Sequence, residues 1–283
     1  MTKRKKEAKP KQKKESVSWK VAKGIGKGLW FLAKTPYYIG KGIYKASKYT
    51  ANKVEESSKK KQVKEKRDKM ISVYENFRLV YTKDGNYLEW EGKIHKAESK
   101  IGVILGARGS GKTAFGMKFL ENAHAKTKKK CYAMGFNPDE MPSWITVVNS
   151  IEEIGNNSIV LIDEGGILFN SRDSMSNANK LLSDLILIAR HKNLTILFIS
   201  QNSSNLDINI LRQADFLVLK PSSLLQRNFE RKIIQQIYDT AQEKFEEYKD
   251  EPGLTHIYSE GFNGFVANPL PSFWGTNISK SFR

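Results

Sequence analysis

The stretch that decides the fold runs Ile101-Gly102-Val103-Ile104-Leu105-Gly106-Ala107-Arg108-Gly109-Ser110-Gly111-Lys112-Thr113. Its first part is an apolar run typical of a buried strand, and its last eight residues, 106–113, match the pattern Gly-x4-Gly-Lys-Thr. We therefore predict a strand over 101–105 and a helix over 112–125. A strand, a glycine-rich turn and a helix in this order are the setting in which a P-loop cradles phosphate groups.

The residue types in this loop suit a nucleoside triphosphate, so all eight residues of 106–113 are candidate binding residues. Gly106, Gly109 and Gly111 let backbone amides approach the phosphates closely. Lys112 is expected to reach the β- and γ-phosphates, and the Thr113 hydroxyl is expected to ligate Mg²⁺. The start of the following helix adds the positive end of its dipole.

Two carboxylates follow a second apolar run about fifty residues later. Ile159-Val160-Leu161-Ile162 leads directly into Asp163 and Glu164. Asp163 is predicted to hold the Mg²⁺ shell at the carboxyl edge of the sheet, where open α/β folds bind ligands. Glu164 is predicted to polarise the attacking water as a general base. This pair favours hydrolysis of ATP over transfer of phosphate to a small molecule.

The segments around these motifs predict a three-layer α/β domain. Strands are predicted at 77–82, 87–94, 101–105, 130–136, 145–148, 158–163, 194–200 and 216–219, and helices at 112–125, 177–192, 206–214 and 225–248. The first two strands flank Lys83-Asp84-Gly85-Asn86, whose Asp-Gly pair favours a hairpin. Runs such as 159–162 and 196–199 are apolar on both faces, as central strands of a mostly parallel sheet are.

The positive charge of the chain is concentrated at its N-terminus. Residues 1–70 contain 23 of the 48 Lys and Arg residues but only 6 of the 30 Asp and Glu residues. The remaining residues, 71–283, are nearly neutral. We therefore divide the chain into a basic arm, 1–70, and a P-loop domain, 71–283, that includes a C-terminal helix and an aromatic tail. A balance this basic indicates an anionic partner.

Within the arm, 1–16 has the composition of a disordered segment, 17–54 is amphipathic, and 55–70 is a charged linker. The amphipathic part interleaves lysine with aromatic residues such as Trp19, Trp30 and Tyr44. Lysine with interfacial tryptophan favours an acidic membrane surface. The same residues would suit nucleic acid, through phosphate neutralisation and base stacking. We slightly prefer the membrane surface and keep both alternatives.

Cysteine usage and hydropathy bear on the compartment. The single cysteine, Cys131, excludes an internal disulfide and is expected to be a buried strand residue. No apolar run approaches the roughly 18 residues of a membrane span, and the N-terminus lacks a secretory signal. We expect a cytoplasmic or membrane-peripheral protein of the host cell. The four histidines give no metal-ligand cluster, so Mg²⁺ carried with the nucleotide is the only metal implied.

Two further features indicate which division of P-loop proteins the chain is similar to. A candidate strand at 130–136 lies between the two motifs along the chain, and an intervening strand is what the additional-strand, catalytic-glutamate division of P-loop proteins has. The strand at 194–200 is followed by Gln201, which is expected to lie beside the γ-phosphate and to report hydrolysis. Arg190-His191 precedes that strand, and Leu206-Asp207 and Leu211-Arg212 follow it.

This series of motifs, over roughly 98–222, resembles the FtsK–HerA superfamily. Two branches are similar: the genome-packaging ATPases of membrane-containing viruses, and the zonula occludens toxin-like (Zot) assembly ATPases of filamentous phages. The strand ending in Ser200-Gln201-Asn202 is what narrows the resemblance, since the P-loop and Asp163-Glu164 are common to the wider class. Toxin-like proteins carry a membrane-spanning helix after the ATPase domain, and this chain lacks one, so the packaging branch is the better match.

The resemblance implies a hexameric ring that hydrolyses ATP to move double-stranded DNA, with capsid proteins as further partners and the virion as a destination. The alternative is a filament-assembly or secretion ATPase at the membrane. A third hypothesis is a nucleotide-dependent scaffold held at a membrane by the arm. Ring ATPases commonly complete each site with an arginine of the neighbouring subunit. Arg172, Arg190 and Arg212 are the candidates, and we choose Arg172.

The C-terminal part is expected to pack. The predicted helix at 225–248 carries Phe229, Ile233 and Ile237 and should pack against the domain or a neighbouring subunit. The tail beyond Thr255 is rich in aromatic residues. Packing within its own domain is preferred to docking on an adjacent protomer.

Overall fold

The structure is a computed structural model that describes residues 52–96, 99–163, 187–275 and 278. The chain separates into two compact units, Met1–Gln62 and Val63–Arg283. Of the first unit only the helical stretch 52–62 is described, and Glu55–Lys59 and Glu56–Lys60 form exposed ion pairs along it. The predictions for 1–16 and 17–51 lie outside the described residues.

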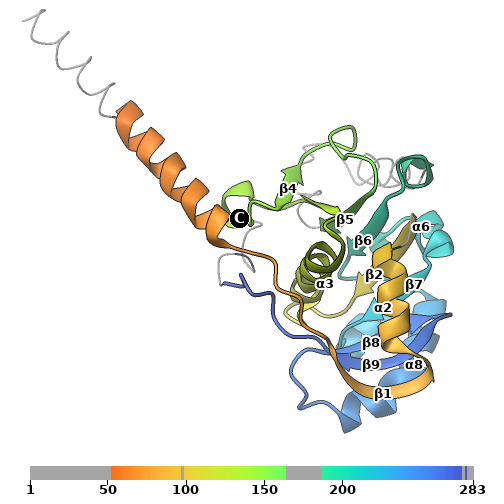
Figure 1. Cartoon of the computed structure of the whole chain (residues 1–283). Coiled ribbons are helices and arrows are strands. Elements are labelled where there is room, and N and C mark those ends of the chain that lie inside the picture. Colours follow the sequence, from red (N-terminus) through yellow and green to blue (C-terminus); the bar gives the residue numbers. More distant parts are fainter. Residues whose placement is uncertain (1–51, 97–98, 164–186, 276–277, 279–283) are drawn as a thin grey trace, which may run out of the picture. The chain divides into compact units, whose positions relative to one another are not determined.

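The second unit is built on a mixed, mostly parallel sheet (Figure 1). Its nine strands, counted over the described residues, are β1 (Arg78–Gly85), β2 (Lys100–Leu105), β3 (Lys130–Met134), β4 (Ile145–Val148), β5 (Ser158–Asp163), β6 (Thr195–Ile199), β7 (Phe216–Leu219), β8 (Leu254–Ser259) and β9 (Phe262–Ala267). Their order is β1-β9-β8-β7-β2-β6-β5-β3-β4. The strands from β7 to β4 pair in parallel, and β8, β9 and β1 extend the sheet in antiparallel fashion.

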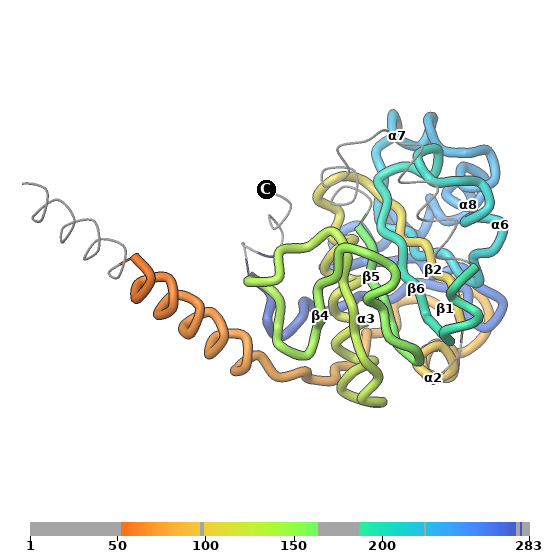
Figure 2. Tube along the Cα trace, turned by 90° about the horizontal axis from the view of Figure 1, so that it is seen from above, coloured from red at the N-terminus to blue at the C-terminus, as the bar shows by residue number. Residues whose placement is uncertain are grey.

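Helices cover both faces of this sheet, as Figures 1 and 2 show from two directions. On one face, α3 (Lys112–Thr127) packs against β2, β5 and β6. Beside it, the aromatic residues of α2 (Tyr87–Lys96) contact Phe216 of β7 and Phe262 of β9. On the other face lie the helical residues 187–192, α6 (Ile208–Gln213) and α8 (Lys232–Glu247). Each face has its own hydrophobic cluster, because successive strand residues point to opposite sides of the sheet. The predicted three-layer α/β fold is confirmed.

Six strands were predicted from their apolar runs, and all six are present as β2 to β7. The bounds of β4, β5 and β7 agree with the prediction, and the others differ by one or two residues at an end. The helices predicted at 112–125 and 206–214 are α3 and α6. Of the helix predicted at 177–192, residues 187–192 are described and are helical. Cys131 is buried on β3, as predicted.

The hairpin predicted over 77–94 is wrong. Its first half is β1, but its second half is the helix α2. Tyr87, Trp90 and Ile94 are buried at a spacing of three and four residues, which is the period of a helix. Asn86 caps this helix, since its Oδ1 accepts hydrogen bonds from the amides of Leu88 and Glu89. The Asp-Gly pair belongs to the end of β1.

The predicted single helix at 225–248 is two helices, α7 (Leu224–Asn228) and α8. Ile237 is buried, whereas Phe229 and Ile233 are exposed, so the expected packing holds only for part of this segment. The tail beyond Thr255 packs within its own domain, as preferred, although its strands β8 and β9 were not predicted. Phe262 and Phe265 of β9 are buried in the two clusters.

The strand that intervenes between the two motifs is β6, and the prediction that 130–136 intervenes is wrong. In the sheet, β6 lies between β2, which precedes the P-loop, and β5, which ends in Asp163. The strand at 130–136 is β3, on the far side of β5. The prediction took the order of strands along the chain as their order in the sheet. The two orders differ because crossover connections in parallel sheets change the spatial order of strands.

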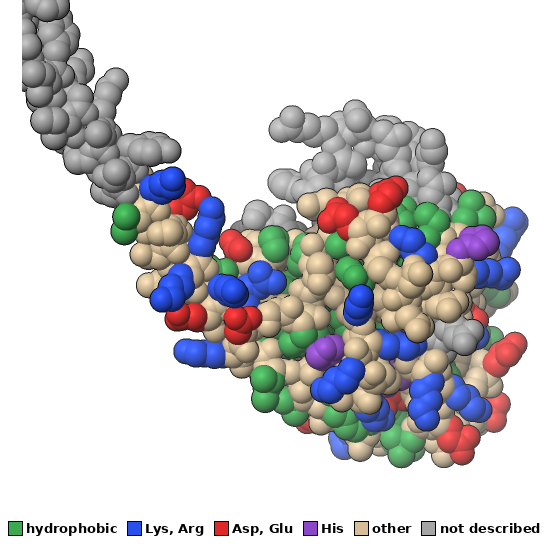
Figure 3. Space-filling view, turned by 45° about the horizontal axis from the view of Figure 1, so that its top comes forward, with side chains coloured by type: hydrophobic (Ala, Val, Ile, Leu, Met, Phe, Trp, Pro, Cys, Tyr) green, Lys and Arg blue, Asp and Glu red, His purple; other side chains and the backbone are tan. Residues whose placement is uncertain are grey.

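Charged side chains are mixed on the surface of this unit. Figure 3 shows Lys and Arg lying among Asp and Glu on the face that it displays. This agrees with the near balance of charge over 71–283. Among the described residues, no helix has both the length and the hydropathy needed to cross a membrane.

Candidate functional site

The candidate site lies at the edge of the sheet where the parallel strands end. Ile104 of β2 is opposite Ile199 of β6, which is opposite Asp163 of β5. On the other side of β2, Leu105 is opposite Leu219 of β7. The segments that follow these strands therefore meet at one edge, which is where open α/β folds bind their ligands.

The P-loop residues have the backbone geometry of a phosphate cradle. Gly109 and Gly111 have φ angles of 78° and 89°, which glycine adopts without a steric penalty. At Gly106 a Cβ atom would lie 2.6 Å from the Cβ of Lys220, so a larger residue would push the loop away from β7. The Ala107 amide donates to the carbonyl of Pro221, which holds the loop to the segment after β7.

Lys112 folds back onto the loop. Its Nζ donates hydrogen bonds of 2.8 Å to the carbonyls of Gly106 and Ala107, and its side chain is buried. Burial lowers the pKa of Lys112, and the carboxylates of Asp163 and Glu230 act in the opposite direction. The ammonium therefore lies at the centre of the loop within reach of two negative charges.

The predicted Mg²⁺ ligands are Thr113, at the start of α3, and Asp163, the last residue of β5. Asp163 is 8% exposed. One hydroxyl and one carboxylate are hard oxygen donors, and Mg²⁺ on a nucleotide commonly takes few protein ligands beside phosphates and water. The donor set therefore fits this metal. Over the part of the chain that the structure describes, no cluster of His, Cys, Asp and Glu offers another metal site.

Two predicted site residues, Glu164 and Arg172, lie outside the described residues. The other candidate arginines are described. Arg190 is exposed at the end of the helical segment before β6, and Arg212 is exposed on α6 shortly before β7. Arg190 precedes the start of β6 and Arg212 precedes the start of β7, and it is the ends of these two strands that lie at the P-loop edge. The two arginines therefore lie toward the opposite edge of the sheet, and neither adjoins the P-loop of this chain.

Gln201 follows β6 at the P-loop edge, and its side chain is exposed. Its backbone carbonyl accepts a hydrogen bond from Gln226 of α7. The residues after Gln201 also bond to this part of the chain: the Ser204 hydroxyl donates to the Phe229 carbonyl, and Arg231 donates to the Ser203 carbonyl. The loop after β6 and the α7–α8 corner thus form one hydrogen-bonded unit.

Glu230 is a further candidate site residue, and the sequence did not predict it. It is 5% exposed; its Oε2 accepts from the Ser203 amide at 2.7 Å, while its Oε1 has no hydrogen-bond partner. Burial raises the pKa of Glu230, and the charge of Lys112 opposes that rise. No sequence signal marks this residue, because Asn228-Phe229-Glu230-Arg231 matches no motif and is placed only by folding.

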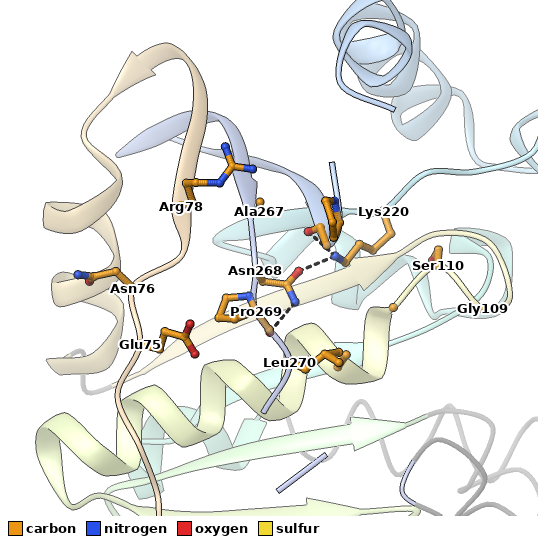
Figure 4. Close-up of a pocket in the computed structure, with 14 residues that line it drawn as sticks. Glu75, Asn76, Arg78, Gly109, Ser110, Lys220, Ala267, Asn268, Pro269 and Leu270 are labelled. Carbon is orange, nitrogen blue, oxygen red and sulfur yellow. Dashed lines mark hydrogen bonds between the residues drawn. The ribbon is translucent and has the colours of Figure 1, made fainter. Parts of the chain in front are cut away.

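A pocket of about 650 Å³ adjoins the other side of the P-loop (Figure 4). Its walls come from the P-loop with α3, from the segment leading into β1, from the end of β7, and from the ends of the β8–β9 hairpin; the lining includes Gly109, Ser110, Ala114, Lys220, Pro252 and Leu270. Figure 4 shows the side chains of Lys220 and Asn268 directed toward one another between the loop and β9.

Lys220 was also missed, although a sequence signal for it existed. It follows the apolar run Phe216-Leu217-Val218-Leu219, just as Asp163 and Gln201 come at the ends of their apolar runs. A polar residue at that position of a parallel strand lies at the ligand-binding edge. The rule that selected Asp163 selects Lys220 as well.

Comparison with known proteins gave matches among solved structures alone. A scan against protein-family models and a search of curated proteins both found no match. The DNA-packaging ATPase B204 from Sulfolobus Turreted Icosahedral Virus is 16% identical, with a TM-score of 0.43, over 62% of this chain and 98% of that chain.

The genome packaging NTPase B204 from Sulfolobus turreted icosahedral virus 2 also matches. Its complex with ATP-gammaS gives 16% identity and a TM-score of 0.42, and its complex with AMPPCP gives 16% and 0.41, each over 61% of this chain and 98% of that chain. These proteins are of the packaging class that the motifs resemble. At this identity and TM-score the likeness assigns no activity or partner to the chain.

Proposed function

We propose that this chain hydrolyses ATP and couples hydrolysis to movement of double-stranded DNA, as a ring-forming genome-packaging motor. The observation that carries the ATPase proposal is the arrangement at one edge of the sheet: a P-loop after β2, β6 beside it, and Asp163 at the end of the next strand. This arrangement supports the proposal because it puts the P-loop and the Asp163 carboxylate at one edge of the sheet, where a triphosphate and its Mg²⁺ would bind together.

In this proposal the loop amides and Lys112 hold the β- and γ-phosphates, and Lys112 exchanges its two loop carbonyls for phosphate oxygens. Thr113 and Asp163 hold Mg²⁺, which neutralises charge on the phosphates when bound. Glu164 directly follows Asp163 in the sequence and orients the attacking water. Gln201 follows β6, the strand between β2 and β5, and contacts the γ-phosphate end of the site.

The pocket beside the P-loop suits the nucleoside. Pro252, Pro269 and Leu270 give it an apolar wall that a flat base can lie against, and the backbone of Gly109 and Gly111 leads from it to the phosphate cradle. Its volume, about 650 Å³, is in the range of small-molecule sites. A base in this pocket and phosphates on the loop fit one nucleotide across both.

The DNA substrate and the ring are supported by the sequence. The motifs over roughly 98–222 resemble the FtsK–HerA superfamily, and residues 1–70 carry a large excess of Lys and Arg for an anionic partner. The exposed arginines Arg190 and Arg212 are available to a neighbouring subunit's site, and the sequence adds Arg172 as a candidate. The arm would then hold the ring at an acidic membrane surface or on nucleic acid, with capsid proteins as further partners.

The test is an ATPase assay of the full chain with and without double-stranded DNA, beside a mass measurement with nucleotide. A packaging motor is expected to assemble into a closed oligomer and to hydrolyse ATP faster with DNA. Hydrolysis indifferent to DNA, by a chain that assembles on anionic vesicles, would favour the filament-assembly alternative. Binding without turnover would favour the scaffold. Turnover by a chain that stays monomeric would contradict the ring.

A further inference from the structure

Lys220 is a fully buried lysine at the P-loop, and its partners are all neutral. Its Nζ donates to the carbonyl of Gly253 at 2.9 Å, to the carbonyl of Leu254 at 3.2 Å, and to the Oδ1 of Asn268 at 2.6 Å. Among the ion pairs of the described residues, none includes Lys220. A buried charge that no opposite charge offsets is costly, so its location needs an explanation.

The same side chain lies directly behind the phosphate cradle. Its Cβ fills the space beside Gly106, and a Cβ on Gly111 would lie 3.9 Å from its Nζ. Its amide donates to the carbonyl of Leu105, the residue before the loop, at 2.8 Å. Lys220 also forms part of the wall of the pocket beside the loop (Figure 4). Lys220 thus contacts the P-loop through its backbone and Cβ and both ends of the β8–β9 hairpin through its ammonium.

We propose that Lys220 is a positioning residue of the nucleotide site, which holds the P-loop against the β8–β9 hairpin and supplies a buried positive charge that the phosphates of a bound nucleotide offset. This inference rests on the proposed function, since it requires a nucleoside triphosphate on the loop. The anion that Lys220 lacks among its protein partners is, on this proposal, the substrate.

The charged surroundings of Lys220 leave room for that anion. Charged and titratable groups around it include Arg108 and Lys112 from the P-loop and α3, Glu75 and Arg78 from the entry to β1, Glu251 from the turn before β8, His256 from β8, Tyr238 from α8 and Glu230 from the residues before α8. Of the carboxylates, Glu75 pairs with Lys118, Glu251 pairs with Arg78, and Glu230 accepts from the Ser203 amide. The Tyr238 hydroxyl donates to the Lys220 carbonyl and adds no charge.

The protonation state of Lys220 should change when nucleotide binds. Burial lowers the pKa of Lys220 to about 7, so part of the free protein has a neutral amine at this position. A bound polyphosphate raises that pKa again, because a nearby negative charge favours the ammonium. Nucleotide binding should therefore take up a proton. Since the bound form is the more protonated one, affinity is greatest below pH 7 and falls as the pH rises above it.

The test is calorimetric titration of the full chain with Mg²⁺ and ATPγS at pH 7.5, in Hepes and in Tris, which differ in ionisation enthalpy. On binding ATPγS, wild type is expected to take up more protons per site than Lys220→Met does, by more than about half a proton. The Kd of wild type for ATPγS should weaken roughly tenfold between pH 7 and 8.5. Subtracting the variant removes proton exchange by the nucleotide itself. Lys130→Met, which changes an exposed lysine at the start of β3, should behave as wild type.

Lys220→Arg keeps the charge but does not titrate in this range, so it should bind with little proton uptake and a flat pH profile. If Lys220→Met does not fold, wild type against Lys220→Arg gives the same comparison. Binding by wild type with a pH-independent Kd, or with proton uptake equal to that of a folded Lys220 variant, would overturn this inference alone. Complete absence of nucleotide binding by wild type would overturn the proposed function and this inference with it.

Discussion

The amide of Ser203 donates a hydrogen bond of 2.7 Å to the carboxylate of Glu230, and this bond links the loop after β6 to the corner between α7 and α8. The other carboxylate oxygen of Glu230 is buried without a partner, and the charge of Lys112 acts on the group. Glu230 therefore joins the γ-phosphate side of the proposed site to the exposed helices.

Replacing Glu230 by Gln should be more favourable to the melting temperature at pH 8 than at pH 4.5, when the variant is compared with wild type at each pH. Burial raises the pKa of Glu230 in the folded state, so wild type loses stability as the pH rises from the unfolded pKa through the folded one. Gln cannot ionise, yet its side-chain oxygen still accepts from Ser203. Melting temperatures across this pH range check the prediction.

Glu230→Ala is the matched control, because it removes the acceptor for the Ser203 amide as well. It should melt below wild type at every pH. If Glu230→Gln melts as low as Glu230→Ala at pH 8, the carboxylate is needed for the bond itself and the pKa argument fails.

Gly116 and Gly92 are both helix-interior glycines, yet alanine should act on them in opposite directions. A Cβ on Gly116 of α3 would lie 2.6 Å from a methyl group of Leu161, whereas a Cβ on Gly92 of α2 would meet nothing within 4 Å. Gly116→Ala should therefore destabilise by about 1–3 kcal/mol through overpacking. Gly92→Ala should stabilise by roughly 0.5–1 kcal/mol through helix propensity.

Urea unfolding of the two variants measures both free energies. Gly116→Ala should also weaken nucleotide binding, because a shift of α3 on β5 displaces the loop at its start. Equal effects of the two substitutions would contradict the close packing of α3 against the sheet.

The buried ion pair of Lys118 and Glu121 is expected to hold the two ends of the domain together. Both side chains are fully buried, and the Glu121 carboxylate also accepts from the amides of Val73 and Ser272. Glu121→Ala should cost about 3–5 kcal/mol, since it leaves a buried ammonium with less compensation and two amides unpaired.

The control for that prediction is Glu247→Ala, which breaks the exposed Lys244–Glu247 pair and should leave the unfolding transition unchanged. Urea denaturation of both variants gives the comparison. A loss for Glu121→Ala as small as that for Glu247→Ala would show that the ends are held by other contacts.

Cys131 should be inert in the folded protein. It is 1% exposed, and burial raises the pKa of its thiol to about 12, so almost no thiolate exists at pH 8. A thiol reagent at pH 8 should label it only after unfolding by urea. Fast stoichiometric labelling of the native protein would contradict the burial of β3.

Much of the fold could be predicted because the parallel strands are unambiguous in the sequence. The runs that became β5 and β6 are apolar on both faces, and the P-loop fixes what precedes and follows it. Strand order could not be read in the same way. The sequence places 130–136 between the two motifs, whereas the folded sheet places β6 there, since order depends on how helices cross over.

The errors at the ends of the domain have the same kind of cause. The sequence predicts a strand at Tyr87 and Trp90 because an Asp-Gly pair precedes them, but their burial follows the helical period. Glu230 entered the site only through its bond to Ser203, a contact between residues 27 positions apart that no local pattern reports.

The most direct test of the central claim is phosphate release from ATP by the full chain with Mg²⁺, measured for wild type and for Lys112→Ala. We expect turnover by wild type and a loss of at least about a hundredfold in the variant, which should still unfold in one cooperative transition in the absence of nucleotide, because the hydrogen bonds of the Lys112 ammonium go to two loop carbonyls and not to the core. Turnover by folded Lys112→Ala at the wild-type rate, or none by wild type, would contradict it.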